Sequence, residues 1–411
     1  MPINVSKMPE KNKPRLIVCQ HGARRGYAVP RMLEEAGMLE ALYTDSCEYS
    51  NLGRLAKVVG PLSSGSINRL AGRRIKGVPK GKIFATDVPT YKCIIKKRGK
   101  SKINDYLLSH ESMNNQMIRF GTRNADAIYC FEGENLGYIR YAKEQGLKIY
   151  LDVCINPLTE KILREERRKY EKEISFNVID EYAEFRMNYF ISQSSVSDIL
   201  LCPSEFVASG VKELIPEYES KISICPYGVN KNSKSLRGIP VKGRFFWAGR
   251  DWIRKGLHYL AQAANELKQK YPDMQFRAAG ITDPKVTQME QFKHITFLGS
   301  LNKEQMKEEY MSADAFVFPT LSEGMAGVVI DAIVAGCPVI TTKSAGIDAI
   351  ENGENGIIVS EGNTEDLCVA IERVYCDREF RNIMAANAIE LAKQYTNDIY
   401  KDLLINILRK F

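Results

Sequence analysis

The sequence lacks any apolar segment long enough to span a membrane as a helix. No run approaches the roughly 18 uncharged residues that a bilayer span requires, and the first residues, MPINVSKMPEKNKPRL, contain no continuous apolar stretch. We therefore expect a chain that is neither secreted nor transmembrane. With 29 glycines and 16 prolines, the chain also lacks the bias of fibrous or disordered sequences and has the composition of an ordinary globular protein.

Paired cysteine motifs are absent as well. The ten cysteines are scattered, and the sequence contains no C-x-x-C pair and no Cys/His cluster. Buried reduced thiols explain this distribution better than disulfides do. The sequence thus supports neither a zinc site nor a dithiol redox centre, and we predict no metal site. Six of the cysteines lie inside apolar runs, namely Cys19, Cys130, Cys154, Cys202, Cys225 and Cys337.

The length points to two domains. At 411 residues the chain exceeds what one hydrophobic core usually organises, so we expect two domains with a cleft between them. Residues 227–244, YGVNKNSKSLRGIPVKGR, are rich in Asn, Ser, Lys, Gly and Pro and show no periodicity, which is typical of a linker. We place the first domain at residues 1–229 and the second at residues 230–387, followed by an amphipathic helical segment.

Short β-rich runs alternate with longer amphipathic segments, regularly in the second half of the chain and less regularly in the first. In residues 256–271, for example, Leu257, Leu260 and Leu267 recur at helical spacing. This alternation predicts βαβ units and parallel sheets with helices on both faces. The expected strands are 15–20, 127–131, 148–153, 199–204, 222–227, 244–249, 276–280, 295–299, 315–320, 338–342 and 356–360.

The net charge of +8 is unevenly distributed. Between Arg69 and Lys102 there are twelve Lys or Arg residues and a single acid, Asp87. A solvated basic surface is at least as common an explanation for such a run as a functional one. The region shows no nucleic-acid-binding motif and little aromatic interleaving, so we expect no nucleic acid. An anionic membrane surface or a phosphate-bearing acceptor fits the run better.

Residues 319–340, PTLSEGMAGVVIDAIVAGCPVI, follow an expected strand and contain two acids, Glu323 and Asp331. We expect a helix over about residues 326–335, ended by Gly336. Ligands of doubly wound sheets bind at the carboxyl ends of the strands, so the N-terminus of this helix offers an anion site in the cleft. The two acids could accept hydrogen bonds from hydroxyls beside that site. The segment therefore favours a phosphorylated, hydroxyl-rich ligand such as a sugar nucleotide.

Cations follow another expected strand, 244–249. Arg250 comes directly after it, and Arg254 and Lys255 open the next helix. Arginine offers a fork for phosphate oxygens and lysine a point charge. Each feature alone has a simpler explanation, because acids are common at helix starts and surface cations are usually solvated. In combination, the two segments describe a site for a diphosphate between hydroxyl-rich groups.

These motifs resemble those of the family 4 glycosyltransferases, which are retaining enzymes of the GT-B type with two Rossmann-like domains. The likeness rests on AGRDWIRKGL, PYGVN and the stretch from ITFLG to CPVI, and covers the second domain almost end to end. HGARRGYAVPRML and LLCPSEFVASG extend it more weakly into the first domain. The resemblance implies an α/β fold of two doubly wound domains facing across a cleft, with a C-terminal helix at about 388–411 that packs back on the first domain.

The resemblance also implies roles for individual residues. Arg250 and Lys255 would hold the donor diphosphate and neutralise the leaving group, and Glu323 would contact hydroxyls of the donor sugar; these three are the catalytic candidates. The amides of residues 325–327 would receive phosphate or sugar oxygens, and Asp331 would bind the ribose. The matching donor-binding positions are Gly22, Arg250, Lys255, Gly324, Met325, Ala326, Gly327 and Asp331.

Two positions depart from the family's pattern. The second acid is Asp331 where the family usually has the longer Glu, which predicts a displaced or water-mediated ribose contact. After the expected strand 148–153 the chain continues CINP, where many members place a His near the reacting sugar. We name four candidates for the acceptor or near-sugar side of the site, which are His21, Arg24, Cys154 and Asn156.

The implied activity is the retaining transfer of a sugar from a nucleotide-diphosphate sugar to a hydroxyl of a saccharide or lipid-linked acceptor. Polysaccharide, lipopolysaccharide or glycolipid synthesis is the usual setting, without an essential metal or other cofactor. We expect a cytoplasmic enzyme, with peripheral contact to the inner membrane face through residues 69–102. Two alternatives stay open: another enzyme on this fold, such as a nucleotide-sugar epimerase or a phosphorylase, and a catalytically silent sugar-nucleotide-binding protein.

Overall fold

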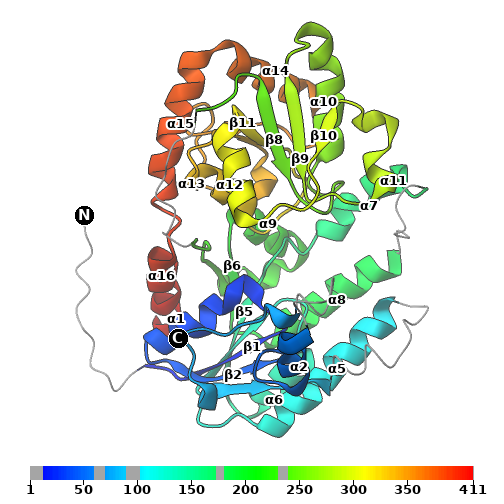
Figure 1. Cartoon of the computed structure of the whole chain (residues 1–411). Helices are drawn as coiled ribbons and strands as arrows, with labels where there is room; N and C mark the ends of the chain where they lie inside the picture. Colours follow the sequence, from blue (N-terminus) through cyan, green and yellow to red (C-terminus); the bar gives the residue numbers. More distant parts are fainter. Residues whose placement is uncertain (1–12, 60–69, 89–101, 173–179, 230–238, 411) are drawn as a thin grey trace.

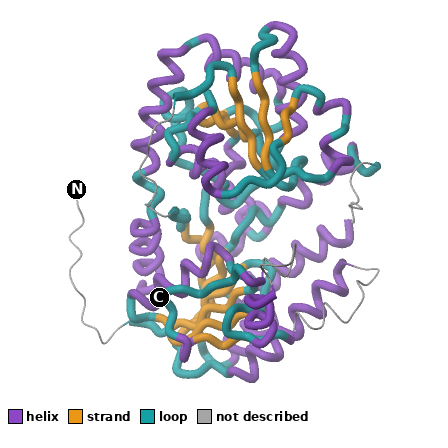
Figure 2. Tube along the Cα trace, in the orientation of Figure 1, coloured by secondary structure: helices purple, strands orange, loops and turns teal. Residues whose placement is uncertain are grey.

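The computed structural model describes residues 13–59, 70–88, 102–172, 180–229 and 239–410. Each half of the chain builds one parallel β-sheet, and the two halves lie one above the other in Figure 1. Helices cover both faces of each sheet, as Figure 2 shows by colour. The central strands are short apolar runs whose residues are almost all buried, which is typical of parallel sheets covered on both sides. The predicted α/β fold of two doubly wound halves is confirmed.

The N-terminal half forms a seven-stranded sheet of order β3-β2-β1-β4-β5-β6-β7. Two of these strands, β2 and β3, were not among the expected ones. The strands are β1 Leu16–Gln20, β2 Leu39–Thr44, β3 Ile83–Ala85, β4 Ala127–Phe131, β5 Lys148–Asp152, β6 Ile199–Cys202 and β7 Ile222–Ile224. The α-helices are α1 Ala28–Glu35, α2 Asn51–Val59, α5 Lys102–Phe120, α6 Leu136–Glu144, α7 Thr159–Lys169, α8 Asp180–Val196 and α9 Glu205–Leu214; short 3-10 helices span Arg24–Tyr27, Lys80–Lys82 and Pro216–Lys221.

The C-terminal half forms a six-stranded sheet of order β10-β9-β8-β11-β12-β13, and all six expected strands are present. They are β8 Arg244–Ala248, β9 Gln275–Ala279, β10 Ile295–Phe297, β11 Ala315–Phe318, β12 Val339–Thr341 and β13 Ile357–Ile358. The α-helices are α10 Leu257–Lys270, α11 Pro284–Thr287, α12 Lys303–Ser312, α13 Gly327–Val334, α14 Thr364–Cys376, α15 Arg378–Ala392 and α16 Asn397–Lys410; 3-10 helices span Glu290–Phe292 and Lys343–Ala345.

The chain crosses back to the N-terminal half just before α16. Residues up to Tyr395 pack in the core of the C-terminal half, whereas Tyr400, Leu404 and Leu408 of α16 pack in a core of the N-terminal half. The two segments that pass between the halves lie side by side, because Val229 and Thr396 form an isolated β-bridge. The segment expected to cross, about 388–411, therefore begins within α15, and the helix that packs on the first half begins at Asn397. In Figure 1 α15 and α16 follow one another down the side of the molecule.

Helix α7 belongs to the N-terminal half by sequence but packs on the other half. Leu163 is fully buried in the core of the C-terminal half, and Tyr170 meets the Trp252 ring edge-on at 4.8 Å. Figure 1 shows α7 close to β9 and α11, away from the lower sheet. This helix therefore links the two halves directly.

Candidate active site between the two domains

The centre of the candidate site is the carboxylate of Glu323, in the loop between β11 and α13. Its Oε1 accepts from Lys255 Nζ at 2.5 Å and pairs with Arg254 Nη1 at 2.7 Å. All three side chains are largely buried, with exposed fractions of 13%, 15% and 16% for Glu323, Lys255 and Arg254. The structure thus brings together two of the three catalytic candidates. The third, Arg250, is exposed and has no ion pair or hydrogen bond within the described parts of the chain.

Backbone contacts between the loop after β8 and the loop after β11 place Arg254 beside Glu323. The Leu321 amide and the Thr320 hydroxyl both donate to the carbonyl oxygen of Arg254, at 2.8 and 2.9 Å. Gly256 adopts a φ of 71°, and a Cβ there would lie 1.9 Å from the Pro319 carbonyl oxygen, so a residue with a side chain could not pass this close. Burial lowers the pKa of Lys255, while Glu323 acts in the opposite direction. The pair therefore places a desolvated cation where a ligand anion could replace the carboxylate as its partner.

The backbone around the start of α13 is only partly free to bind a ligand. The amides of Glu323 and Ala326 donate to the carbonyls of Ser344 and Ala345, at 2.9 and 2.8 Å. Ala326 is thus an unsuitable phosphate ligand, contrary to its predicted role. A Cβ added at Gly327 would meet no atom within 4 Å, so the space beside this residue is open. The first-turn amides that remain suited to an anion are those of Gly327 and the residue that follows it.

The other predicted donor-side residues have structural contacts of their own. A Cβ on Gly324 would lie 1.8 Å from the Cys154 carbonyl oxygen, so this glycine is needed for close packing between the halves rather than for ligand approach. The buried Met325 accepts from the Tyr227 amide through its sulfur at 3.0 Å. Asp331 lies on an exposed position of α13; partial burial of its carboxylate raises its pKa, and Lys303 of α12 opposes this. Its ribose contact stays a prediction.

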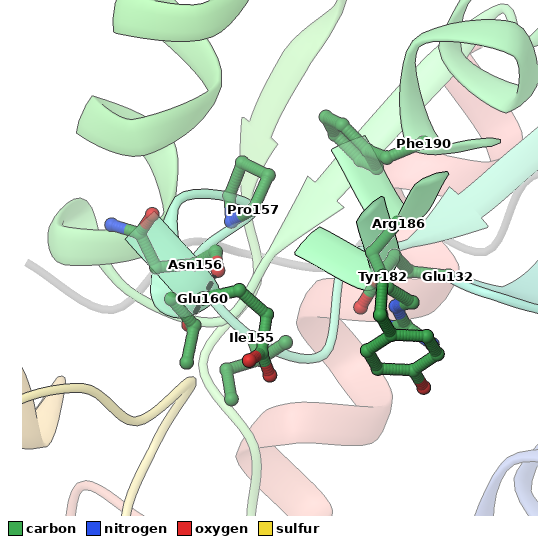
Figure 3. Close-up of a pocket in the computed structure, with 9 residues that line it drawn as sticks. Glu132, Ile155, Asn156, Pro157, Glu160, Tyr182, Arg186 and Phe190 are labelled. Atoms are coloured by element: carbon green, nitrogen blue, oxygen red, sulfur yellow. Dashed lines mark hydrogen bonds and ion pairs between the residues drawn. The ribbon is translucent and has the colours of Figure 1, made fainter. Parts of the chain in front are cut away.

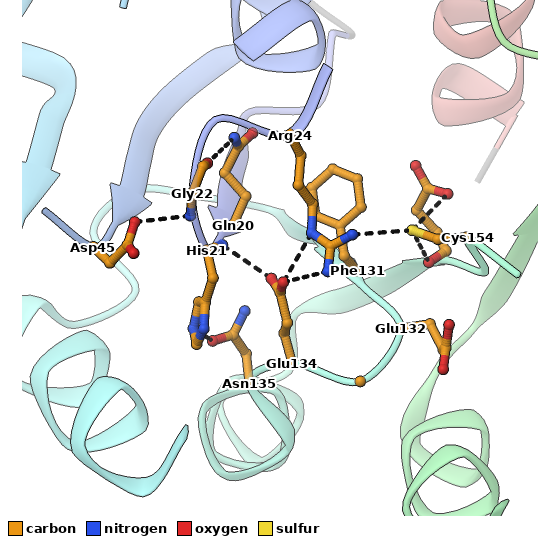
Figure 4. Close-up of polar contacts among 12 residues, drawn as sticks. Gln20, His21, Gly22, Arg24, Asp45, Phe131, Glu132, Glu134, Asn135 and Cys154 are labelled. Atoms are coloured by element: carbon orange, nitrogen blue, oxygen red, sulfur yellow. Dashed lines mark hydrogen bonds and ion pairs between the residues drawn. The ribbon is translucent and has the colours of Figure 1, made fainter. Parts of the chain in front are cut away.

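The N-terminal half contributes the loop after β1 (Figure 4). Gly22 has a φ of 68°, and its amide donates to Asp45 Oδ1 at 2.8 Å. Arg73 Nη1 pairs with the other oxygen of Asp45 at 2.7 Å, and its Nη2 would lie 3.6 Å from a Cβ on Gly22. One arginine of the basic stretch thus lies beside the predicted diphosphate loop. Arg69, Lys96 and Lys97 of that stretch lie outside the described residues, and its contact with a membrane stays a prediction.

His21 and Arg24 both converge on a buried acid that sequence reasoning missed. Glu134 is 4% exposed and follows β4, and its Oε1 accepts from Arg24 Nε and Nη2 at 2.8 and 2.5 Å. The His21 amide donates to its other oxygen, and the His21 ring lies 2.9 Å from Asn135 Oδ1. Figure 4 shows the Arg24 guanidinium between Glu134 and Cys154. The position of Glu134 after a buried strand was the available sequence signal, because polar residues there line the cleft.

The remaining two candidates lie in the loop after β5. The Sγ of Cys154 lies 3.8 Å from Arg24, and burial followed by repulsion from Asp152 raises the pKa of this thiol. Asn156 is 3% exposed, and both ends of its amide are used locally: Nδ2 donates to the Phe206 carbonyl at 2.8 Å and Oδ1 accepts from the Leu158 amide at 2.9 Å. Asn156 therefore fixes the loop, and no contact made by the described residues gives it a role at the reacting sugar.

Direct hydrogen bonds join the loop of Glu323 to the N-terminal half. Thr159 and Ser322 hydroxyls lie 2.7 Å apart, and the Ser204 hydroxyl donates to the Gly324 carbonyl at 2.7 Å. The loop that carries Glu323 is thus held against the N-terminal half on both sides of the acid.

Residues 242–377 match the family model described as Glycosyl transferases group 1. This match lies within the C-terminal half of the chain. Among curated proteins, a D-inositol 3-phosphate glycosyltransferase of Corynebacterium urealyticum is 24% identical over 240 residues, which are 52% of this chain and 57% of that protein. Sulfoquinovosyl transferase SQD2 of Arabidopsis thaliana is 29% identical over 166 residues, which are 38% of this chain and 31% of that protein. The chain thus matches about half or less of the length of these relatives.

Solved structures resemble the whole chain. Sucrose-phosphate synthase from Thermosynechococcus elongatus superposes with a TM-score of 0.67 at 13% identity, covering 97% of this chain and 99% of that one. Anabaena Alr3699/HepE in complex with UDP gives a TM-score of 0.63 at 14% identity, covering 97% and 100%. At such identities the likeness shows the fold, which is GT-B. None of the helices in the described part of the chain is long and apolar enough to cross a membrane.

Proposed function

We propose that the chain is a retaining glycosyltransferase that moves a sugar from a nucleotide-diphosphate sugar to a hydroxyl of a saccharide or lipid-linked acceptor. The observation that carries the proposal is the Glu323–Lys255–Arg254 cluster, which lies beside the open start of α13 in a group 1 glycosyltransferase domain. Structural neighbours add support, since Anabaena Alr3699/HepE was solved in complex with UDP and with UDP-glucose. The proposal includes a cytoplasmic location with peripheral membrane contact. Sedimentation with anionic liposomes tests the membrane contact.

The cluster suits the leaving diphosphate. In the proposed reaction the bond between the anomeric carbon and the diphosphate oxygen breaks, and the acceptor oxygen bonds to that carbon from the same face. The acceptor's proton passes to the leaving phosphate oxygen. Lys255 and the free amides of α13 stabilise the charge that develops on the diphosphate, and Glu323 orients the sugar hydroxyls. Arg254 holds Glu323 when Lys255 turns to the phosphate. No metal takes part in the proposed step.

A thermal-shift screen against UDP, GDP, ADP and CDP sugars tests the proposal. One nucleotide sugar should raise the melting temperature, because a ligand stabilises in proportion to its occupancy. Lys255→Ala should abolish that shift and lower turnover on the order of a hundredfold. Lys270→Ala is the matched control, because Lys270 lies at the opposite end of α10 and is 63% exposed.

Turnover is then followed with that donor in the presence of EDTA. Transfer to an acceptor hydroxyl should persist in the chelator. Rapid epimerisation of the donor alone, loss of turnover with EDTA, or an unchanged shift in Lys255→Ala would each contradict the proposal.

A further inference from the structure

Charged side chains of alternating sign run from the N-terminal half to the candidate active site, and each is paired with the next. In order, this ion-pair series consists of Glu160, Arg167, Asp251, Arg254, Glu323 and Lys255. The first two members belong to α7, and the others lie in the loops after β8 and β11. The charges of the series therefore cancel, and it crosses between the halves at its second pair.

The outer end of the series lies in the first turn of α7. Glu160 lines a cavity of about 250 Å³ beside α8, and Figure 3 shows it across from Tyr182. That cavity also contains a separate ion pair, between Glu132 and Arg186 at 2.7 Å. Glu160 binds the guanidinium of Arg167, about two turns further along α7, and so orients it.

Arg167 connects the two halves. Its side chain is 11% exposed, and its Nη2 donates to Asp251 Oδ2 at 3.5 Å while Nη1 binds Glu160. The preceding residue, Glu166, contacts His258 of α10 at 3.2 Å, which holds this part of α7 against the C-terminal half. One largely buried guanidinium thus serves a carboxylate from each half of the chain.

Asp251 orients Arg254 within the loop after β8. Its Oδ1 accepts from the Arg254 amide at 3.2 Å, and its Oδ2 lies 3.4 Å from Arg254 Nε. The same guanidinium donates through Nη1 to the Ser322 carbonyl at 2.7 Å and pairs with Glu323 Oε1 at 2.7 Å. Asp251 and Glu323 therefore compete for one guanidinium, and the acid with fewer other cations attracts it more strongly.

This competition bears on Lys255, the residue proposed to bind the donor diphosphate. Lys255 can leave Glu323 for a phosphate when Glu323 keeps Arg254 as a partner. Without Arg167, the charge of Asp251 would be balanced by Arg254 alone. Arg254 would then shift toward Asp251. Glu323, left with Lys255 as its main partner, would release that lysine less readily.

We propose that Arg167 is a positioning residue, which balances Asp251 and thereby makes Lys255 available to the donor diphosphate. It acts through the ion-pair series and not through contact with the nucleotide or the sugar. The inference rests on the proposed function and extends it, because diphosphate affinity then depends on α7 lying against the C-terminal half.

Titration with nucleoside diphosphates tests the inference before the donor sugar is identified. The probes are UDP, GDP, ADP and CDP, titrated by calorimetry into wild type and Arg167→Met. For the diphosphate that binds wild type, Arg167→Met should weaken the affinity about fivefold, the upper range for one partly exposed ion pair. Unchanged affinity in Arg167→Met would overturn the proposal.

Two further variants show whether the charge of Arg167 matters. Arg167→Lys keeps the positive charge and should bind the same diphosphate within about twofold of wild type. Arg168→Met is the matched control, because Arg168 is 44% exposed and pairs with Glu165 inside α7 at 2.9 Å. It should bind like wild type, and an equal loss of affinity in Arg167→Met and Arg168→Met would contradict a role specific to Arg167.

A double-mutant cycle decides whether Arg167 acts through Asp251. Asp251→Asn removes the charge that Arg167 balances and keeps an oxygen for the Arg254 amide. In this background Arg167→Met should change the affinity less than about twofold. A general loosening of the contact between the halves would instead give the same loss in both backgrounds, which would reject the proposal.

Asp251→Asn alone keeps the proposal testable if Arg167→Met fails to fold. Arg254 then stays on Glu323, so this variant should bind the diphosphate at least as tightly as wild type. Weaker binding would count against the proposal.

The wild-type titration separates this inference from the proposed function. Wild type that binds none of the nucleoside diphosphates would reject the proposed function. Equal binding by wild type and Arg167→Met would reject only the positioning role and leave the glycosyltransferase proposal intact.

Discussion

At the scale of single residues, two glycines of one loop have opposite roles. Gly324 lies against the carbonyl of Cys154 in the other domain, and a Cβ would come within 1.8 Å of that oxygen. Gly327, three residues on, faces open space and begins α13. Their sequence contexts look alike, and both were expected to admit a ligand. The difference arises from the approach of a distant loop, which no local pattern encodes.

We predict that Gly324→Ala destabilises the closed arrangement of the domains. Since the contact is backbone to backbone, the domains must separate or the loop must shift, at a cost of about 1–3 kcal/mol. Differential scanning fluorimetry should show a lower melting temperature, and small-angle scattering a larger radius of gyration. Gly327→Ala should keep or slightly raise the melting temperature, because alanine is the better helix residue. Equal melting temperatures and radii for the two variants would refute this assignment.

The residues of the candidate site were predictable where a strand end fixed them. Glu323 and Lys255 follow strands that alternate clearly with helices, and the structure brings them into contact. The pairing of Arg254 with Glu323 could not be predicted from the sequence, because it depends on the backbone contacts between the two loops, and the role of Arg250 stays a prediction. Glu132 and Glu134 were missed for a related reason: their significance comes from neighbours on α8 and on the β1 loop that are far away in the sequence.

At the scale of elements, α7 couples the domains. Its sequence, TEKILREERRK, is mostly charged, and Leu163 is the residue that it buries in the C-terminal core. Two charged residues of α7 add contacts with the other domain. Arg167 pairs with Asp251 at 3.5 Å, and the carboxylate of Glu166 lies 3.2 Å from the ring nitrogen Nε2 of His258. Hydrogen bonding with His258, followed by burial acting in the opposite sense, lowers the pKa of Glu166 from 4.5 to about 2.

This pKa shift predicts an acid-sensitive contact. A carboxylate whose pKa is lower in the folded state stabilises it above the ordinary pKa, and the contribution is lost as the pH falls through the folded value. The melting temperature of Glu166→Gln should therefore be a few degrees below that of the wild type near pH 7. This difference in melting temperature should shrink as the pH falls from 4.5 to 2. Melting curves of both proteins across that range provide the measurement. Glu165→Gln should follow wild type throughout, and a constant gap for Glu166→Gln would contradict the assignment.

The strands that escaped prediction are those with the weakest patterns. β2, LEALYT, carries a charged residue inside a run that is otherwise buried, and β3 has three residues that are all partly exposed. The two strands are neighbours at the same side of the first sheet. β3 also lies within the basic stretch 69–102, whose composition favours a solvated loop. Neighbouring strands and the covering helices stabilise them, so their strand conformation depends on tertiary contacts.

At the scale of the whole molecule, the chain joins its domains twice, at Val229 and at Thr396. The sequence indicated an amphipathic C-terminal segment, but not where it leaves one domain for the other, because residues 392–397 contain neither glycine nor proline. Tyr400 secures the second crossing. It is 1% exposed, its ring meets Tyr227 edge-on at 5.9 Å, and the Arg25 guanidinium lies 4.5 Å from its centre. The β1 loop, the linker and α16 thus share one aromatic contact.

We predict that Tyr400→Ala destabilises the N-terminal domain by about 3 kcal/mol, the usual cost of truncating a buried aromatic side chain. Both tryptophans, Trp247 and Trp252, lie in the C-terminal core, so their fluorescence reports on that domain, whereas circular dichroism at 222 nm reports on both. In urea, the variant should lose part of its helical signal well before its tryptophan fluorescence changes. Ile399→Ala, at a 48% exposed position of the same helix, should unfold like wild type. If both signals of Tyr400→Ala shift together, the contacts of α7 and α16 join the domains into one cooperative unit, and the two cores do not unfold separately.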